Sequence, residues 1–337
     1  MSEITIKYLA EKLKLAPSTV SRALNDSHEI SSGTKEKVMA LAKELNFQPN
    51  PYARSLREQK SKTIGVIIPE RINNFFSQVI DGMEAVTKAH GYHLLVYNSN
   101  EDIDQEKTIL SLLVGGRVDA IVMSISGQNQ KGEHLKVLKN RAFPIVFFDR
   151  IPLDFPTTKL ITNDYQAGFE GTVHLINKGC KKIIFLVLSK EVSIGKERMR
   201  GYLDALRSHN IPFNESWIVA CGHSEKENIA HLEKVFYKLD RPDGVLASVE
   251  KLALATYRAL AKTHIKMPEQ VRMVSFSNMK IADLLNPPLS TISQPAFEIG
   301  TECAKLLMKK LSKKGQPDLE DKIVTIPSVF TERESSR

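Results

Sequence analysis

The N-terminal part of the chain carries apolar residues at helical spacing. The apolar residues of a first predicted helix recur three and four residues apart, at Ile6, Leu9, Ala10 and Leu13. Thr5 stands at the position of its N-cap. A second short helix is predicted from Pro17, because proline suits the first helical position, and a third from about Ser32 to Leu45 with Ser31 as its cap. The pattern therefore predicts a compact bundle of short helices. The inward-facing residues of the last two helices are Val20, Ala23, Leu24, Val38, Leu41, Ala42 and Leu45.

Residues 14–16 are all that separate the first two predicted helices. Such a short connection forces a tight turn and is typical of a helix-turn-helix. The second helix would then expose Ser18 and Arg22, four residues apart on one face, together with Ser21 and Asn25. Arginine can bond guanine in the major groove and serine can bond base edges or phosphates. The alternative is an ordinary surface helix with solvated polar residues.

From Ile64 onward, short β-branched runs alternate with helical stretches. This βα rhythm predicts parallel, doubly wound sheets, and its two rounds predict two similar lobes. The predicted helices of the first round span about 76–90, 105–113 and 135–140. The predicted strands are buried runs at 64–68, 94–97, 120–123, 145–148, 183–188, 217–220, 244–247 and 273–276.

The segment between the helical head and the α/β part cannot continue a helix. Pro49 and Pro51 lack an N–H and restrict the residues before them. Residues 52–57 are helix-competent, but so short a helix is unstable alone in water. We expect this segment to fold only when it is braced, for example by a DNA groove and a second copy of itself.

Part of the positive charge of the chain is concentrated in its N-terminal part. The 337 residues are 42% hydrophobic and 26% charged, which suits two or three soluble units. The net charge is +8, and residues 1–62 hold 11 lysines and arginines against 7 acidic residues. A basic N-terminal module is what a polyphosphate partner requires. The three scattered cysteines indicate a reduced cytosolic setting.

Several classes of function are not supported by the sequence. It has no membrane-spanning apolar stretch and no signal peptide, so we expect a cytoplasmic protein without a membrane partner. It has no glycine-rich nucleotide loop and no nucleophile elbow. Its histidines are isolated, without metal-ligand spacing. We therefore expect no enzyme, cofactor or metal site.

Five sequence stretches in order resemble one known family. They are residues 4–7, Pro17-Ser18-Thr19-Val20-Ser21-Arg22-Ala23-Leu24-Asn25, Asn50-Pro51-Tyr52-Ala53-Arg54-Ser55-Leu56, Thr63-Ile64-Gly65-Val66-Ile67-Ile68-Pro69, and the C-terminal Thr331-Glu332-Arg333-Glu334-Ser335. Together they resemble the LacI/GalR family of bacterial transcriptional regulators, and the likeness extends over the whole chain.

The resemblance implies a DNA-binding role for the head. Residues 17, 18 and 22 would read bases in the major groove, while Thr19 and Ser21 would lie near phosphates. Leu56 would wedge between base pairs in the minor groove, because unstacking a step kinks the duplex. The predicted DNA-contacting residues are Thr5, Pro17, Ser18, Thr19, Ser21, Arg22, Asn25, Asn50, Ala53 and Leu56.

Two residues of the head depart from the family pattern. Lys14 stands where the family usually has glycine in the turn, and Ala16 stands where a serine usually caps the second helix. The loss of a serine cap costs about 1 kcal/mol. We expect a slightly weakened head with an unchanged role.

The resemblance also implies a clamp like that of periplasmic binding proteins, with an effector in its cleft. The chain would cross between the lobes near 161–163, near 290–294 and again near the C-terminus. The predicted domains are the helix-turn-helix at 1–48, a hinge helix and linker at 49–62, and an effector-binding and dimerisation domain at 63–337, with lobe 1 at about 63–161 and 293–320 and lobe 2 at about 162–292 and 321–332.

Ligands in such folds bind outside the carboxyl ends of the strands. Phe75 could stack on a sugar or belong to the core, Asp149 and Arg150 could bind the effector or form a structural ion pair, and Arg198 could be a plain surface charge. The polar residues could bond hydroxyls or a carboxylate. The predicted effector-binding residues are Asn74, Phe75, Ser124, Asp149, Arg150, Arg198, Glu250 and Asn278.

The cleft also departs from the family pattern. Val249-Glu250 replaces an Asn-Asp pair, and Ser277 stands where an aspartate commonly holds a sugar hydroxyl. A sugar, a sugar acid and a phosphosugar therefore all remain open as effectors. The two arginines favour an anionic group.

These expectations combine into a ligand-responsive regulator of carbohydrate or related small-molecule metabolism. A homodimer or tetramer would bind a near-palindromic operator, as a repressor or less often an activator, and ligand closure would change the spacing of the hinges. The alternatives are a solute-binding protein, which would need a signal peptide and no basic head, and a regulator that no longer responds to ligand.

Overall fold

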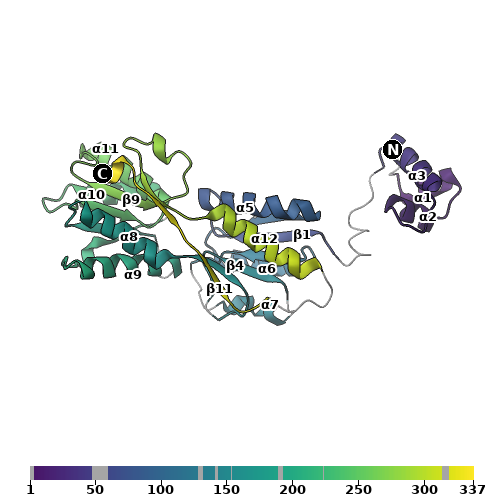
Figure 1. Cartoon of the computed structure of the whole chain (residues 1–337), viewed down its shortest axis with the longest axis horizontal. Helices are drawn as coiled ribbons and strands as arrows, with labels where there is room; N and C mark the ends of the chain where they lie inside the picture. Colours follow the sequence, from purple (N-terminus) through teal and green to yellow (C-terminus); the bar gives the residue numbers. More distant parts are fainter. Residues whose placement is uncertain are drawn as a thin grey trace. The chain divides into compact units, whose positions relative to one another are not determined.

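The structure is a computed structural model, and it describes residues 4–47, 60–127, 132–140, 143–152, 154–188, 193–222, 224–312 and 319–337. The chain divides into two compact units, Met1–Ser61 and Lys62–Arg337 (Figure 1). We call the first unit the head. Asn50, Ala53 and Leu56, which the sequence predicts to contact DNA, lie outside the described residues.

The described part of the head contains three helices, α1 (Ile6–Leu13), α2 (Pro17–Leu24) and α3 (Ser32–Glu44). Two residues of each helix are buried in one common core, as the helical spacing predicts. Figure 1 shows the three helices packed together. The core residues are Leu9, Ala10, Val20, Ala23, Val38 and Ala42.

The ends of these helices follow the predicted capping only in part. Thr5 caps α1, because its side chain accepts a hydrogen bond of 3.3 Å from the amide of Tyr8. Ser31 occupies the N-cap position of α3 but does not cap it through its side chain, because its hydroxyl pairs with that of Thr34 at 2.9 Å. Lys14 ends α1 in the left-handed region at φ 53°, where glycine would carry no steric cost.

Lobe 1 of the second unit is built on a six-stranded, all-parallel sheet. Side chains of successive strand residues point to opposite faces, so Ile64 and Val66 pack under α5 and α12 while Ile67 packs against α6 and α7. The strand order is β11 (Ile323–Ile326), β5 (Lys159–Thr162), β4 (Ile145–Phe148), β3 (Ala120–Met123), β1 (Thr63–Ile68) and β2 (His93–Asn98). The helices are α5 (Asn74–Thr87), η1 (Lys88–His90), α6 (Ile103–Val114), η2 (Glu133–Leu135), α7 (Lys136–Asn140) and α12 (Ala296–Ser312).

Lobe 2 repeats the arrangement with one antiparallel edge. Helices α10 and α11 cover one face of its sheet, and α8 and α9 cover the other (Figure 1). The strand order is β12 (Val329–Thr331), β10 (Ser290–Ser293), β9 (Arg272–Phe276), β8 (Gly244–Ala247), β6 (Ile183–Val187) and β7 (Ile218–Ala220), and only the β10–β12 pair is antiparallel. The helices are α8 (Asp164–Asn177), α9 (Ser193–Ser208), η3 (Glu215–Trp217), α10 (Glu225–Phe236), α11 (Glu250–Thr263), η4 (Ala282–Leu284) and η5 (Glu334–Ser336).

Three segments connect the lobes, after β5, after β10 and between β11 and β12. The prediction that residues 321–332 all belong to lobe 2 is wrong, because β11 pairs with β5 in the sheet of lobe 1, with Ile323 opposite Lys159. The last crossing therefore lies between Ile326 and Val329. Strands β5, β10, β11 and β12 are absent from the sequence prediction, since each has only three or four residues and at least one of them is polar.

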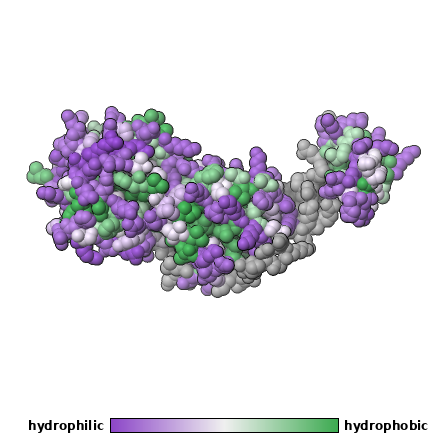
Figure 2. Space-filling model, in the orientation of Figure 1, coloured by the Kyte–Doolittle hydropathy of each residue, from purple (hydrophilic) through white to green (hydrophobic). Residues whose placement is uncertain are grey.

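The surface of the second unit is mainly hydrophilic on the face in Figure 2, with hydrophobic residues gathered in patches on both lobes. Among the described residues, none of the helices combines the length and the apolar character needed to cross a membrane. The same residues contain no group of three or more histidine, cysteine or acidic side chains placed to hold a metal ion.

Candidate functional site

Helix α2 presents a polar face to solvent. Ser18, Arg22 and Asn25 are exposed, whereas Val20 and Ala23 on the opposite face are buried in the head core. The tight turn before α2 produces this division, because it docks the apolar face against α1 and α3. Pro17 is also exposed, Thr19 and Ser21 are partly buried on the same helix, and Thr5 is exposed at the start of α1.

Two exposed side chains, one on α2 and one at its C-cap, already have partners. Nη1 of Arg22 lies 2.9 Å from a carboxylate oxygen of Glu29, and both side chains are more than half exposed. The amide nitrogen of Asn25 donates to the carbonyl of Ser21 at 2.6 Å. An exposed ion pair contributes little stability, so the Arg22 guanidinium can exchange Glu29 for another acceptor at low cost.

A polar cleft lies between the lobes of the second unit. One part of it, which we call the inner cavity, offers about 40 Å³, room for a few water molecules. Lobe 1 and lobe 2 both contribute to it, since the carboxyl ends of their strands face the same gap. The lining residues are Glu70, Asn73, Phe75, Phe76, Asp149, Arg150, Leu188, Ile194, Arg198, Val249, Glu250, Phe276, Ser277, Asn278 and Gln294.

A larger space, which we call the hinge cavity, adjoins the inner cavity and shares Asp149 and Ile194 with it. Its volume of about 490 Å³ falls within the range of small-molecule sites. Isoleucines give it apolar walls beside several polar side chains. The remaining lining residues are Ile151, Ile161, Thr162, Asn163, Asp164, Tyr165, Gln166, Ser193, Lys196, Glu197 and Thr325.

Arg198 is the most constrained polar side chain of the cleft. Its relative exposure is 2%, so the alternative of a surface charge is wrong. Nε donates to Asp164 at 2.6 Å and Nη1 donates to the carbonyl of Ser248 at 2.6 Å. Nη2 is buried without a hydrogen-bond partner in the described part of the chain. Because buried charged donors are normally paired, this atom is a strong candidate for a ligand contact.

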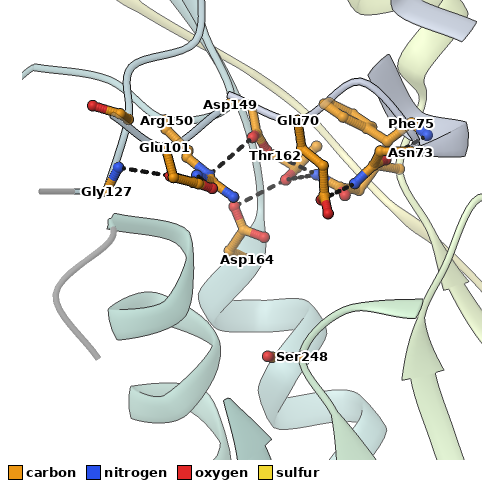
Figure 3. A network of polar contacts seen from close by, with 12 residues as sticks. Glu70, Asn73, Phe75, Glu101, Gly127, Asp149, Arg150, Thr162, Asp164 and Ser248 are labelled. Carbon is orange, nitrogen blue, oxygen red and sulfur yellow. Dashed lines mark hydrogen bonds and ion pairs between the residues drawn. The ribbon is translucent and has the colours of Figure 1, made fainter. Parts of the chain in front are cut away.

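Asp149 and Arg150 form part of a wider network at the end of β4 (Figure 3). Arg150 donates from Nη1 to Glu101 at 2.5 Å, and the second oxygen of Glu101 accepts the amide of Gly127 at 3.0 Å. The distance from Arg150 Nε to Asp149 is 3.9 Å, which is too long for a hydrogen bond. Glu101 is therefore the short-range partner of Arg150, and the simple Asp149–Arg150 ion pair is the weaker contact.

Asp149 has an unusual backbone conformation and a carboxyl with a shifted pKa. Its φ is 59°, which is uncommon for a residue with a side chain and frequent at functional sites. Burial raises the pKa of its carboxyl, although the charges of Arg150 and Arg198 oppose the shift. Gln294 donates to this carboxyl at 3.4 Å from the crossing that follows β10.

The remaining predicted residues divide into three groups. Phe75, Glu250 and Asn278 line the inner cavity, and Phe75 also packs 6.4 Å from Phe148, so it serves the core as well. Asn74 does not line the inner cavity but donates to Glu250 at 2.8 Å. Ser124 follows β3, is fully buried and lines neither cavity.

Several polar residues that the structure places in or beside the cavities are absent from the sequence prediction, among them four that line the inner cavity or hold its arginines. Glu70 and Gln294 line the inner cavity, Asp164 holds Arg198, and Glu101 holds Arg150. Gln294 and Asp164 lie at the predicted crossings between the lobes. The predicted crossings could have indicated that these two residues belong to the site, because a residue at a crossing between the lobes lies beside the cleft.

A helix-turn-helix head followed by a two-lobed α/β clamp defines a ligand-responsive, DNA-binding transcriptional regulator. Comparison with known families agrees with this class. Residues 5–50 match the bacterial regulatory proteins of the lacI family, and residues 61–333 match the periplasmic binding proteins and sugar binding domain of the LacI family. The chain therefore belongs to the LacI family.

Individual relatives cover nearly the whole chain. It is 28% identical to catabolite control protein A of Priestia megaterium over 338 residues, which cover 99% of each chain. It is 30% identical to the HTH-type transcriptional repressor PurR of Vibrio parahaemolyticus over 312 residues, which cover 92% of each. A solved structure titled transcriptional regulator CelR–cellobiose complex has a TM-score of 0.72 at 21% identity and covers 98% of this chain and 99% of that one, so it shares the fold.

Proposed function

We propose that the protein is a homodimeric repressor that binds a near-palindromic operator and responds to a sugar or a sugar derivative. The observation that carries this proposal is the buried Arg198, whose Nη2 has no hydrogen-bond partner among the described residues. The same chain exposes Ser18 and Arg22 on helix α2 of the head. Neither an enzymatic activity nor a cofactor is part of the proposal. Operator DNA as the partner places its action in the bacterial cytoplasm.

The proposed DNA contacts begin with α2 in the major groove. Ser18 and Arg22 would contact base edges, while Pro17, Thr19, Ser21 and Asn25 would contact bases or the backbone, with Thr5 near a phosphate. Two heads in a dimer would engage half-sites about one helical turn apart or further. Asn50, Ala53 and Leu56 would complete the contact in the central minor groove, with Leu56 as the wedge.

The proposed effector site is the inner cavity together with the hinge cavity. Arg198 and Arg150 would donate to oxygens of the effector, Asn278 would bond a hydroxyl, and Phe75 would pack against an apolar face of a sugar ring. The relative with cellobiose in its title and a fold neighbour titled with bound ribose support a carbohydrate. The two arginines favour a carbohydrate that carries an acidic group.

The effector would act through the segments that join the lobes. A ligand bound to both lobes favours one interlobe angle over the other, and the equilibrium shifts by the difference in its affinity for the two states. A changed angle would alter the spacing of the two hinge segments in a dimer. A coupling of about 1–3 kcal/mol between effector and operator is typical of such systems.

Genome-wide footprinting of the purified full-length chain tests this proposal. The expected result is a set of sites that share one near-palindromic motif, whose occupancy changes when a candidate sugar or sugar acid is added. A thermal-shift screen identifies the candidates, because a tight ligand raises the melting temperature by mass action. Occupancy without a shared motif would exclude the proposed operator recognition.

A further inference from the structure

The N-termini of two helices from different lobes meet across the cleft. Glu250 is the first residue of α11 in lobe 2, and Asn74 is the first residue of α5 in lobe 1. Oε1 of Glu250 accepts the side-chain amide of Asn74 at 2.8 Å and its backbone amide at 3.4 Å. The other carboxylate oxygen accepts the hydroxyl of Ser277 at 3.2 Å. One carboxylate thus bonds groups of both lobes.

The position of this carboxylate is electrostatically favourable. A helix N-terminus carries partial positive charge and free amides, so it stabilises an anion. The Glu250 carboxylate lies in the first turn of its own helix, where the N-cap residue Val249 provides no side-chain hydrogen bond. It also accepts the first amide of α5, whereas the side-chain oxygen of the N-cap Asn73 accepts the next amide, that of Phe75. A single negative charge therefore lies at the N-termini of two helices, α11 and α5, and is stabilised by both.

Two more contacts join the lobes on the same side of the cleft. Lys251, the next residue of α11, donates to Glu70 of lobe 1 at 2.7 Å. Gln78, one turn along α5, donates to the carbonyl of Asn278 of lobe 2 at 2.8 Å. These direct bonds occupy polar groups at the cleft and leave the inner cavity at about 40 Å³.

We propose that Glu250 is an interlobe latch, a carboxylate that acts as a built-in ligand for the N-terminus of α5 and holds the clamp closed when no effector is bound. The length of the side chain is essential to this role, because the carboxylate must reach Asn74 from the backbone of the other lobe. An effector that fills the inner cavity must displace this carboxylate or bind beside it. The latch goes beyond the proposed function and does not depend on which effector binds.

Distance measurements between spin labels test the latch in the full-length chain. Labels at the exposed positions Glu84 of α5 and Lys226 of α10 report on the two lobes, and the three native cysteines are buried. When the labelled chain is diluted with an excess of unlabelled chain, so that a dimer contains at most one labelled pair, the wild type should give one narrow distance. Glu250→Ala should shift most of the population to longer distances, and Glu250→Asp should do the same, since it keeps the charge but is one methylene shorter.

Added acetate gives the test a second readout. Acetate can occupy the place of the missing carboxylate, so it should return the Glu250→Ala distances toward the wild-type value and leave the wild-type chain unchanged. Asn74→Ala, which removes the partner in lobe 1, should lengthen the distance part of the way. Glu225→Gln is the matched control, because Glu225 pairs with Arg258 within lobe 2, and it should leave the distances unchanged.

The latch would be overturned if Glu250→Ala and Glu250→Asp gave the wild-type distances while folding cooperatively. An opened Glu250→Ala chain that acetate leaves open would also contradict it, since the carboxylate would not be the bridging group. Because the measurement uses neither DNA nor effector, these outcomes leave the proposed function untouched. If the wild-type chain bound no operator, the proposed function would be excluded, and the latch would remain untouched.

Discussion

The guanidinium of Arg198 lies 3.9 Å above the centre of the Phe276 ring. Asp164 and the carbonyl of Ser248 hold two of its nitrogens at 2.6 Å each. The stacked ring and these two acceptors fix the plane of the guanidinium before any ligand arrives. A donor positioned in advance loses less conformational entropy when it binds, so Arg198 is well suited to recognise an effector oxygen.

Arg198→Ala should lower the free energy of unfolding by about 3–5 kcal/mol, because it removes the charged partner of the buried Asp164 carboxylate and leaves it only the hydroxyl of Thr162. Urea denaturation of the full-length chain measures this loss. Arg207→Ala is the matched control: Arg207 pairs with Asp204 at 2.9 Å while its own side chain is 80% exposed, so its removal should cost less than about 1 kcal/mol. If the two variants lost the same free energy of unfolding, the buried Arg198–Asp164 pair would contribute no more to stability than an exposed ion pair.

Asp149→Asn should stabilise the chain at neutral pH. Burial raises the folded-state pKa of Asp149, so its ionisation costs the folded state more than the unfolded one. The gain should be largest above the folded-state pKa, decrease as the pH falls through that value, and vanish below the ordinary value of 3.8. Denaturation curves across this pH range measure it, with the exposed Asp283→Asn as control. A gain that does not change with pH would contradict this origin.

Arg22→Ala should weaken operator binding by about 1–3 kcal/mol and loosen the preference at one base position. Glu29→Gln should strengthen binding to operator and unrelated DNA, because it removes the carboxylate that competes for Arg22 and repels phosphates. Fluorescence anisotropy with both kinds of duplex measures these changes. Lys37→Ala, which removes an exposed cation of α3, should weaken binding to operator and to unrelated DNA by the same factor. If Arg22→Ala also weakened binding to both duplexes by the same factor, base reading by Arg22 would be excluded.

Gly201→Ala should destabilise lobe 2 by about 1–3 kcal/mol, as overpacking does. A Cβ at Gly201 would lie 2.1 Å from the carbonyl oxygen of Tyr165, so α9 would have to move away from α8. Because α9 also carries Arg198, effector affinity should fall with stability. Gly222→Ala is the control within the same lobe, since its Cβ would meet nothing within 4 Å. A wild-type melting temperature for Gly201→Ala would show that the helix pair tolerates the extra atom.

The elements with a strong local pattern could be predicted from the sequence. The three helices of the head and the buried strands β1, β3, β4 and β8 follow from apolar spacing alone, because one face or both faces of each must leave water. Strands β10 and β11 could not be predicted in this way. Ser290 and Ser293 break the apolar pattern of β10, and β11 is a run of only four residues, so each is recognised as a strand only from its pairing with β9 or β5.

The site residues divide along the same line. Asp149 and Glu250 could be predicted as cleft residues because they follow predicted strands at the carboxyl edge of a sheet, and Arg198, which is also predicted, lies inside α9. Their partners could not be predicted. Asp164 lies 34 residues from Arg198 in the sequence and Glu250 lies 176 residues from Asn74, and only the folded arrangement of two lobes brings such pairs together.

The sequence by itself determined the class of this protein: a basic helical head with an amphipathic second helix, followed by two rounds of βα units. Local periodicity and residue chemistry are enough for that, because each element must bury its own apolar face. The tertiary structure decided what the cleft side chains do. It pairs Arg198 with Asp164, ties Arg150 to Glu101, and uses Glu250 to bridge the lobes, since hydrogen bonds depend on distances that no linear pattern encodes.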